Sequence, residues 1–234
     1  GMNDAALRMF RQEARSAAAM NHPNIVLIYD VGILGGRNCI LMEYVPGQTV
    51  RELMRVGSGK KKRKRALPPR KVTEIAHETC AALAYAHTLR IIHRDVKPAN
   101  IIISENGRVK LTDFGISKML EGAGNDETQA KGTPQYMAPE QILGRPLDGR
   151  ADLYALGISM FEMTTGRRPF VGEDVVDKQL HQELPDPASL NPDTPAKLAE
   201  IILRACAKQA DARYANAEAM QEALAGFLQE SGTE

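Results

Sequence analysis

The sequence has few cysteines and no long hydrophobic run, and both deficits narrow the kind of protein that it can be. Three cysteines, Cys39, Cys80 and Cys206, are scattered through 234 residues in apolar contexts and lack the spacing of metal ligands. We therefore expect reduced, buried thiols in a cytoplasmic protein. No apolar stretch approaches the roughly 20 residues that cross a bilayer, and no signal-peptide pattern opens the chain. These absences argue against a disulfide-stapled secreted protein and against a membrane-spanning one.

The composition is otherwise ordinary, but the charge is unevenly distributed. Charged residues make up 25% of the chain, hydrophobic residues 43%, and the formal net charge is +1. Residues 60–65 are six consecutive lysines and arginines within a low-complexity stretch at 57–65. Because like charges repel, we expect a disordered, solvated insertion there. Docking of the run to an acidic partner, a nucleic acid or an anionic surface is the alternative.

The periodicity of apolar residues predicts a mixture of helices and short strands. Helical spacing covers 4–20, 71–89, 195–208 and 216–229, and an apolar helix is expected from 152 to 163. Two apolar segments, 25–34 and 38–45, are joined by a glycine pair and predict a hairpin. A short helix is expected at 49–56.

A second predicted hairpin has polar residues at both of its open ends. The β-branched run at 101–103 is too short for a helix, and a turn at 105–107 leads to another strand at 109–111. Asp95, Lys97 and Asn100 precede this hairpin and Asp113 follows it. Antiparallel pairing would bring these side chains to neighbouring strand ends. Two acids and an amide suit Mg²⁺, which prefers hard oxygen ligands and often shares them with phosphates.

These residues stand in two motifs that resemble the signature of protein kinases. Residues 93–100 read H-R-D-V-K-P-A-N, and residues 113–115 read D-F-G. The resemblance implies that Asp95 orients or deprotonates a hydroxyl and that Lys97 faces the γ-phosphate of ATP. It also implies that Asn100 and Asp113 hold Mg²⁺.

The resemblance extends over essentially the whole chain and implies its fold class. The match is closest to the bacterial eukaryotic-like Ser/Thr kinases, with G-T-x-Q-Y-x-A-P-E at 132–140; Lys97 and Thr133 are features of the Ser/Thr type. It implies an α+β, protein-kinase-like fold. Residues 1–45 would form a truncated small lobe of one helix and a hairpin. Residues 46–234 would form a mainly helical large lobe that carries the basic insertion.

The resemblance also assigns a nucleotide site to the first lobe and its border. Met42 stands at the gatekeeper position, Glu43 and Val45 lie in the hinge that binds adenine through its backbone, and Ile102 forms the floor. Glu13 corresponds to the helix acid that pairs with a strand lysine. Considered without the family, Glu13 is a solvated surface acid.

Further positions match regulatory and structural residues of the family. Arg94 corresponds to the arginine that receives a phosphorylated activation-loop residue, for which Thr128 is the candidate; the alternative is an ordinary loop threonine. Thr133 lies just before the A-P-E anchor of this segment. Glu140 of that anchor is expected to pair with Arg213, and Asp152 begins the central helix of the large lobe.

The sequence departs from the family pattern at its beginning. No Gly-rich loop and no lysine-bearing strand precede Glu13. We therefore expect weak ATP binding, open to solvent, and a bare edge on the strand at 38–45 that favours a homodimer or a partner chain. Three functions stay open: a Ser/Thr kinase, a pseudokinase that serves as a binding scaffold, and a partial kinase completed by another chain.

Overall fold

The computed structural model describes residues 20–35, 37–57, 63–114 and 134–230. The helix expected at 4–20 lies outside this part of the chain, apart from Met20. Within it, no helix is long and apolar enough to cross a membrane.

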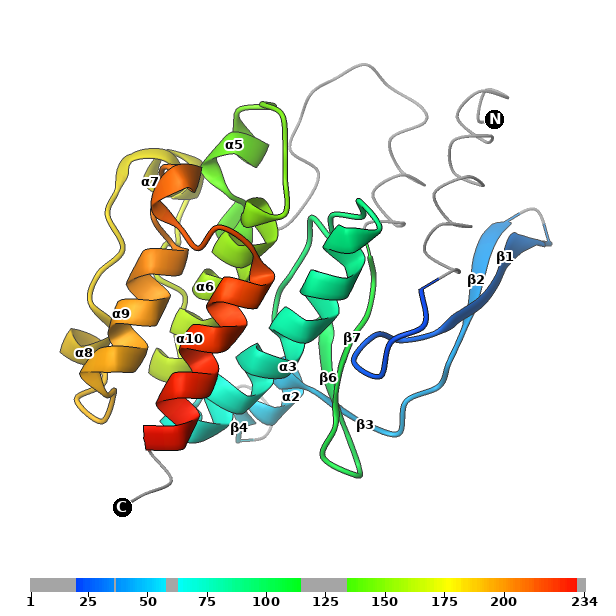
Figure 1. Ribbon diagram of the computed structural model, residues 1–234, viewed down its shortest axis with the longest axis horizontal. Helices are drawn as coiled ribbons and strands as arrows, with labels where there is room; N and C mark the ends of the chain where they lie inside the picture. Colours follow the sequence, from blue (N-terminus) through cyan, green and yellow to red (C-terminus); the bar gives the residue numbers. More distant parts are fainter. Residues whose placement is uncertain (1–19, 36, 58–62, 115–133, 231–234) are drawn as a thin grey trace.

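Four helices form the larger half of the molecule and enclose its hydrophobic core (Figure 1). They confirm the four helices predicted beyond residue 70 and are α3 (Pro69–Thr88), α6 (Arg150–Thr165), α9 (Ala196–Ala205) and α10 (Ala217–Glu230). In α6, 14 of 16 residues are buried. A helix that is apolar on every side belongs at the centre of a protein, and α6 contacts α3, α9 and α10.

The contact of α9 with α6 depends on a glycine. A Cβ atom on Gly157 would lie 2.6 Å from the Cys206 sulfur and 2.9 Å from the Ala205 Cβ. Both distances are shorter than van der Waals contact, so only a residue without a side chain lets the two backbones approach this closely.

Short helices surround this core. They are α2 (Val50–Leu53), α5 (Pro139–Ile142), α7 (Val175–His181) and α8 (Pro187–Leu190), with 3₁₀ turns η2 (Pro134–Tyr136) and η3 (Ala210–Ala212).

The described strands form three separate sheets, and two of them, which contain the predicted hairpins, lie on the other side of α3 from α10 (Figure 1). The predicted first hairpin is confirmed, with β1 (Ile28–Leu34) antiparallel to β2 (Arg37–Met42). The second is confirmed as β6 (Ile101–Ser104) and β7 (Val109–Leu111), and β3 (Gly47–Thr49) pairs with the free edge of β6.

Backbone hydrogen bonds hold the start of the first hairpin against the second. The Val26 amide donates to the Leu111 carbonyl at 3.0 Å, and the Leu111 amide donates to the Asn24 carbonyl at 2.8 Å. The β1–β2 hairpin is therefore tethered to the strand that leads into Asp113.

The described end of the basic run, residues 63–65, is more ordered than its charge predicted. The helix expected at 49–56 ends at Leu53, and β4 (Arg55–Val56) pairs with β5 (Arg63–Lys64) in a small ribbon. Lys64 at the end of this ribbon forms an ion pair with Glu162, whose side chain is 1% exposed. A buried carboxylate is costly without a partner, and this pairing opposes the repulsion within the run. The expectation of disorder is wrong for residues 63–65.

The cysteine prediction holds at two positions and fails at the third. Cys80 and Cys206 are buried, whereas Cys39 is exposed. Burial raises the pKa of the Cys206 thiol to about 12 and also raises that of Cys80. Cys39 lies in β2, which is covered by β1 alone among the described strands.

Candidate active site

The structure brings Asp95, Lys97 and Asn100 into one hydrogen-bonded cluster. The Lys97 ammonium donates to the Asp95 Oδ2 atom at 2.7 Å. The Asn100 Nδ2 atom donates to the Asp95 carbonyl at 2.9 Å and to Oδ2 at 3.2 Å. Five residues of loop are thereby folded back on the Asp95 carboxylate, which is 15% exposed and accessible to a reacting group.

The orientation of the Asn100 amide matters for a metal ion. Both of its donations to Asp95 come from Nδ2, so Oδ1 is the atom that remains to ligate a cation. The Thr112 amide donates to the Asn100 carbonyl at 2.9 Å, which joins this cluster to Asp113, the next residue. A carboxylate and an amide oxygen are the hard ligands that Mg²⁺ prefers, so the residues present fit this ion.

Asp113 has a conformation that is uncommon for a residue with a side chain. Its φ is 62°, and its side chain is exposed. Within the described part of the chain, its carboxylate accepts no hydrogen bond. Left-handed backbone at a non-glycine residue is unfavourable and concentrates at functional sites.

His93 connects the loop to the strand before Asp113. Its Nδ1 atom accepts the Asp95 amide at 3.2 Å, and its Nε2 atom lies 2.9 Å from the Thr112 carbonyl. The ring is buried against Phe114, with centroids 4.5 Å apart. Burial lowers the pKa of His93 despite nearby carboxylates, and the two partners assign its proton to Nε2. The sequence placed His93 in the motif but predicted no role for its side chain.

Asp152 at the start of α6 holds the other side of the same loop. It is completely buried, and its carboxylate accepts the His93 amide at 2.9 Å and the Arg94 amide at 2.8 Å. The His87 Nε2 atom lies 2.8 Å from it. Arg94 has a φ of 65°, so these bonds fix the loop where its backbone is least favourable.

Glu140 and Arg213 form a bidentate ion pair. The two guanidinium nitrogens lie 2.7 and 2.8 Å from the two carboxylate oxygens. Arg213 is buried, and it also donates to the carbonyls of Ala207, Arg150 and Lys208. This pair ties α5 to the segment before α10.

The predicted nucleotide residues lie along the edge between the hairpins. Met42, Asp113 and Phe114 contribute to a small apolar cavity of about 30 Å³, together with Val26, Ile28, Ile40 and Thr112. Ile102 and Val45 are half-buried and do not line this cavity.

The hinge residue Glu43 is held by hydrogen bonds on both sides. Its carboxylate accepts the Leu27 amide at 3.1 Å and the Lys110 ammonium at 2.9 Å. Partial burial raises the pKa of Glu43, but these hydrogen bonds outweigh it and hold the pKa below its ordinary value. Val45 makes no hydrogen bond with any described residue.

The profile of the protein kinase domain family matches residues 2–225 of the sequence. The chain belongs to the protein kinase family. It is 40% identical over 225 residues to the serine/threonine-protein kinase PknB of Mycolicibacterium smegmatis, covering 92% of this chain and 35% of PknB. It is 39% identical over 240 residues to the tyrosine-protein kinase MasK of Myxococcus xanthus, covering 97% and 37%. This kinase chain therefore spans about a third of the length of these relatives.

A solved structure confirms the predicted α+β kinase fold. The kinase domain of PknI from Mycobacterium tuberculosis superposes with a TM-score of 0.74 at 28% sequence identity. The match covers 97% of this chain and 80% of the PknI chain.

Three of the residues predicted for this kinase site, Glu13, Thr128 and Thr133, lie outside the described residues. Arg94 is exposed, and its carbonyl accepts the Gln141 side-chain amide at 3.0 Å. Sequence reasoning missed a polar cavity of about 180 Å³ beside Lys97 and Pro98. These two residues belong to the loop at 93–100, called here the catalytic loop. Glu162, a glutamate in the middle of the largely apolar α6, was the available signal, because a charge at a core position needs a reason.

Proposed function

We propose that this kinase chain transfers the γ-phosphate of ATP to a serine or threonine hydroxyl of a protein. The observation that supports this most directly is the cluster in which Lys97 and Asn100 both donate to the Asp95 carboxylate. Phosphoryl transfer depends mainly on positioning and on neutralising charge, and this cluster supplies both. We also propose that residues 1–45 form the small lobe and residues 46–234 form the large lobe.

The side chains of the cluster have separate roles. Asp95 accepts a hydrogen bond from the substrate hydroxyl and orients its oxygen toward the phosphate. Lys97 holds Asp95 in place, and its ammonium lies where charge develops on the transferred group. His93 keeps the Asp95 backbone fixed through its Nδ1 atom.

Asn100, through Oδ1, and Asp113 would hold Mg²⁺. When bound, the ion neutralises charge on the phosphates of ATP. Met42, Val45 and Ile102 would contact the adenine, with the backbone of Val45 and of Glu43 as hydrogen-bonding groups. This assignment rests on the resemblance and on the absence of hydrogen bonds from Val45 to described residues.

The choice between serine or threonine and tyrosine rests on Lys97, which is a Ser/Thr-type feature of the catalytic loop. The name of MasK makes a tyrosine acceptor the competing specificity. Matched peptides that carry serine, threonine or tyrosine at one position distinguish the two.

The test is phosphate transfer by the purified chain. We expect the mass of a phosphate to be added when the chain is incubated with Mg-ATP and a generic protein substrate. Intact mass spectrometry measures this gain. Asp95→Asn and Asp113→Asn are expected to abolish the gain. Asp177→Asn is the matched control, since Asp177 is 76% exposed and pairs only with His181 on α7 among described residues.

A chain that binds ATP in calorimetry but never gains mass would overturn the proposal and leave a pseudokinase. Gain that appears only after a second polypeptide is added would favour a partial kinase. The β2 strand pairs only with β1 among the described strands, so we also propose contact of the 38–45 edge with another chain. A sedimentation coefficient that is independent of concentration would contradict self-association.

A further inference from the structure

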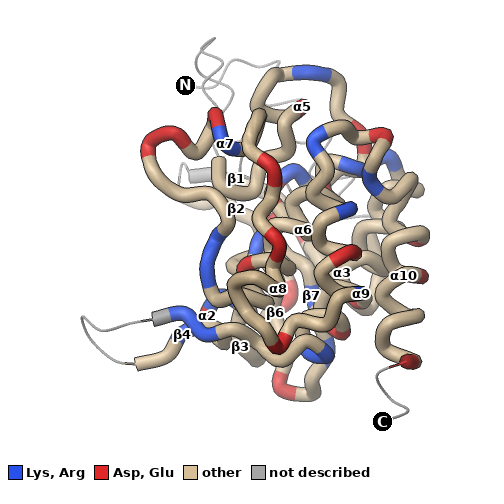
Figure 2. Tube along the Cα trace, turned by 90° about the vertical axis from the view of Figure 1, so that its left-hand side faces the viewer, with Lys and Arg blue, Asp and Glu red and all other residues tan. Residues whose placement is uncertain are grey.

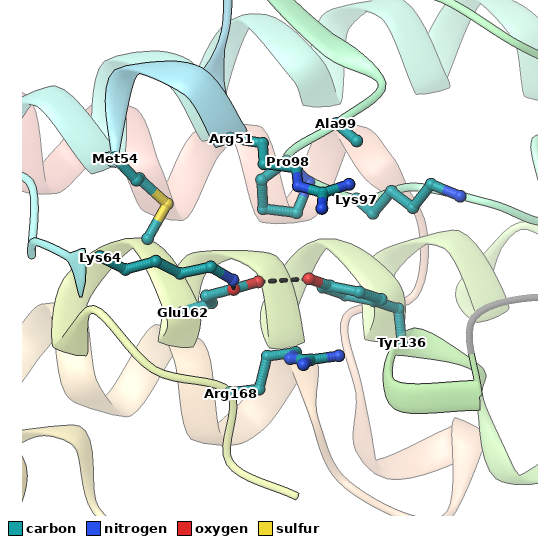
Figure 3. Close-up of a pocket in the computed structure, with 9 residues that line it drawn as sticks. All are labelled: Arg51, Met54, Lys64, Lys97, Pro98, Ala99, Tyr136, Glu162 and Arg168. Atoms are coloured by element: carbon teal, nitrogen blue, oxygen red, sulfur yellow. Dashed lines mark hydrogen bonds and ion pairs between the residues drawn. The ribbon is translucent and has the colours of Figure 1, made fainter. Parts of the chain in front are cut away.

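A cavity beside the catalytic loop carries an excess of positive charge. It has a volume of about 180 Å³ and lies between α2, the catalytic loop, α6 and the loop after α6 (Figure 3). Its charged and hydroxyl-bearing lining residues are Arg51, Lys64, Lys97, Tyr136, Glu162 and Arg168. Four cationic side chains and a single carboxylate therefore line the cavity.

That carboxylate already has its partners. Glu162 is 1% exposed, forms an ion pair with Lys64, and accepts the Tyr136 hydroxyl. Burial, followed by the proximity of Glu162, raises the pKa of Tyr136, so the phenol keeps the proton that it donates. A basic ligand could reach Glu162 only by displacing Lys64.

One of the remaining cations is also satisfied. The Lys97 side chain lines the cavity with its stem, and its ammonium bonds to Asp95 at 2.7 Å. Figure 3 shows this nitrogen turned away from Glu162. The cavity is therefore adjacent to the carboxylate that we propose orients the substrate hydroxyl.

Arg51 and Arg168 differ from Lys64 and Lys97 in having no carboxylate partner among the described residues. Neither forms an ion pair with any carboxylate in the part of the chain that the structure describes. They come from α2 and from the loop after α6, and they lie on either side of the Glu162–Tyr136 pair (Figure 3). Their charges act on the Tyr136 hydroxyl from both sides, as expected for two guanidinium groups that face one cavity.

The basic ribbon adds to this field. Lys64 is opposite Arg55 in the β4–β5 register, and the Lys and Arg segments lie next to α2 in Figure 2. The Arg65 amide, just after the ribbon, donates to the Met54 carbonyl at the end of α2 at 2.8 Å, and the chain after the ribbon packs closely against Gly166. A Cβ on Gly166, whose φ is 74°, would lie 3.1 Å from the Ala66 backbone nitrogen.

We propose that this cavity binds an acidic side chain of the protein substrate, a carboxylate or a phosphate, next to the residue that is phosphorylated. Guanidinium groups bind both anions through paired, charge-assisted hydrogen bonds. The inference rests on the proposed kinase function and adds a substrate class to it. Arg51 and Arg168 are the residues that determine this specificity.

The experiment is a peptide scan with the full chain. Peptides share one acceptor serine or threonine, and each carries alanine, glutamate, phosphoserine or lysine at a single flanking position. We expect glutamate or phosphoserine at one position to raise kcat/KM about tenfold to a hundredfold over alanine, the range for a hydrogen bond to a charged group. Comparison of the glutamate and phosphoserine peptides identifies which anion is used.

The preference is expected to disappear in the double variant Arg51→Ala/Arg168→Ala. Arg168→Lys should restore part of it, because a lysine keeps the charge without the fork of donors. Arg167→Ala is the matched control: Arg167 is exposed and does not line the cavity. It should keep the full preference. Circular dichroism checks that each variant is folded.

A second readout separates this inference from the proposed function. Fluorescence anisotropy of the same peptides, without ATP, measures their binding independently of transfer. If no peptide is phosphorylated but the acidic one binds more tightly in an Arg168-dependent way, the kinase proposal fails and the acidic subsite stands. If peptides are phosphorylated with no acidic preference, with a lysine preference, or with a preference that survives in the double variant, the subsite inference is overturned.

Discussion

Replacement of Asp152 by alanine should loosen the catalytic loop and destabilise the protein. The Asp152 carboxylate accepts the amides of His93 and Arg94 at 2.9 and 2.8 Å and lies 2.8 Å from the His87 Nε2 atom. Without it, the buried His93 amide would have no acceptor. An unsatisfied buried donor costs about 1–3 kcal/mol, and the half-buried Arg94 amide adds a smaller amount. We expect a loss of about 2–4 kcal/mol of unfolding free energy, out of the roughly 5–15 kcal/mol typical of a domain.

Urea denaturation followed by circular dichroism measures this loss. The Asp152→Asn variant keeps one acceptor oxygen and should lie between wild type and alanine. Asp177→Ala also removes a carboxylate that contacts a histidine, since its Oδ1 atom lies 2.9 Å from the His181 Nδ1 atom, but this carboxylate is 76% exposed. It should change the stability by less than about 1 kcal/mol. Amide exchange at His93 and Arg94 should accelerate only in the Asp152 variants.

Equal, small losses for Asp152→Ala and Asp177→Ala would refute the reasoning. They would mean that the loop amides find other acceptors or that water reaches them. Unchanged amide exchange together with lost stability would place the effect in α6 packing and not in the loop.

Three further predictions concern packing and protonation. Gly157→Ala should cost about 1–3 kcal/mol, the usual penalty of overpacking, whereas Gly32→Ala, whose added Cβ meets nothing within 4 Å, should be nearly neutral in the same denaturation assay. Burial lowers the pKa of His93, so its contribution to stability is complete above the unfolded value of about 6.5 and is lost as the pH falls from there through the folded value. Nitrogen NMR should therefore show a ring that is protonated at Nε2 and stays neutral to a lower pH than an unburied imidazole, and a ring that becomes charged at or above about pH 6.5 would contradict the assignment. Glu43 has a lowered pKa, so its hydrogen-bonded carboxylate stabilises the fold above about pH 4.3, and this stabilisation is lost as the pH falls through the lower folded pKa. The stability difference between wild type and Glu43→Gln should vanish at acidic pH, and a difference that stays constant down to pH 2 would count against the Lys110 and Leu27 contacts.

Local patterns predicted most of the described elements because those elements are decided locally. The apolar spacing of α3 and the largely apolar α6 leave few alternatives, and the turn between β6 and β7 sets their pairing. Element ends were less accurate: the short helix ends at Leu53, and the strand predicted to begin at residue 25 begins at Ile28.

The predictions that failed share a physical cause: they depend on contacts between residues that are distant in sequence. Repulsion within the basic run is a local argument, and it could not include Glu162, which lies 98 residues from Lys64 in the chain. The cavity could not be predicted for the same reason, because Arg51 and Arg168, which line it, are also distant in sequence. Cys39 was expected to be buried from its apolar neighbours, but β2 has only β1 beside it among the described strands.

Two aspartates show why the sequence alone does not assign roles within the site. Asp152 and Asp113 are the same residue type, and both lie beside the catalytic loop. Asp152 is completely buried, and its carboxylate accepts hydrogen bonds from two backbone amides. Both of its oxygens are therefore used to hold the loop. Asp113 is exposed, accepts no hydrogen bond from any described residue, and has a φ of 62°. The Asp113 carboxylate is therefore the one that we propose takes a ligand, because no described residue occupies it and its backbone is strained, as is common at functional sites.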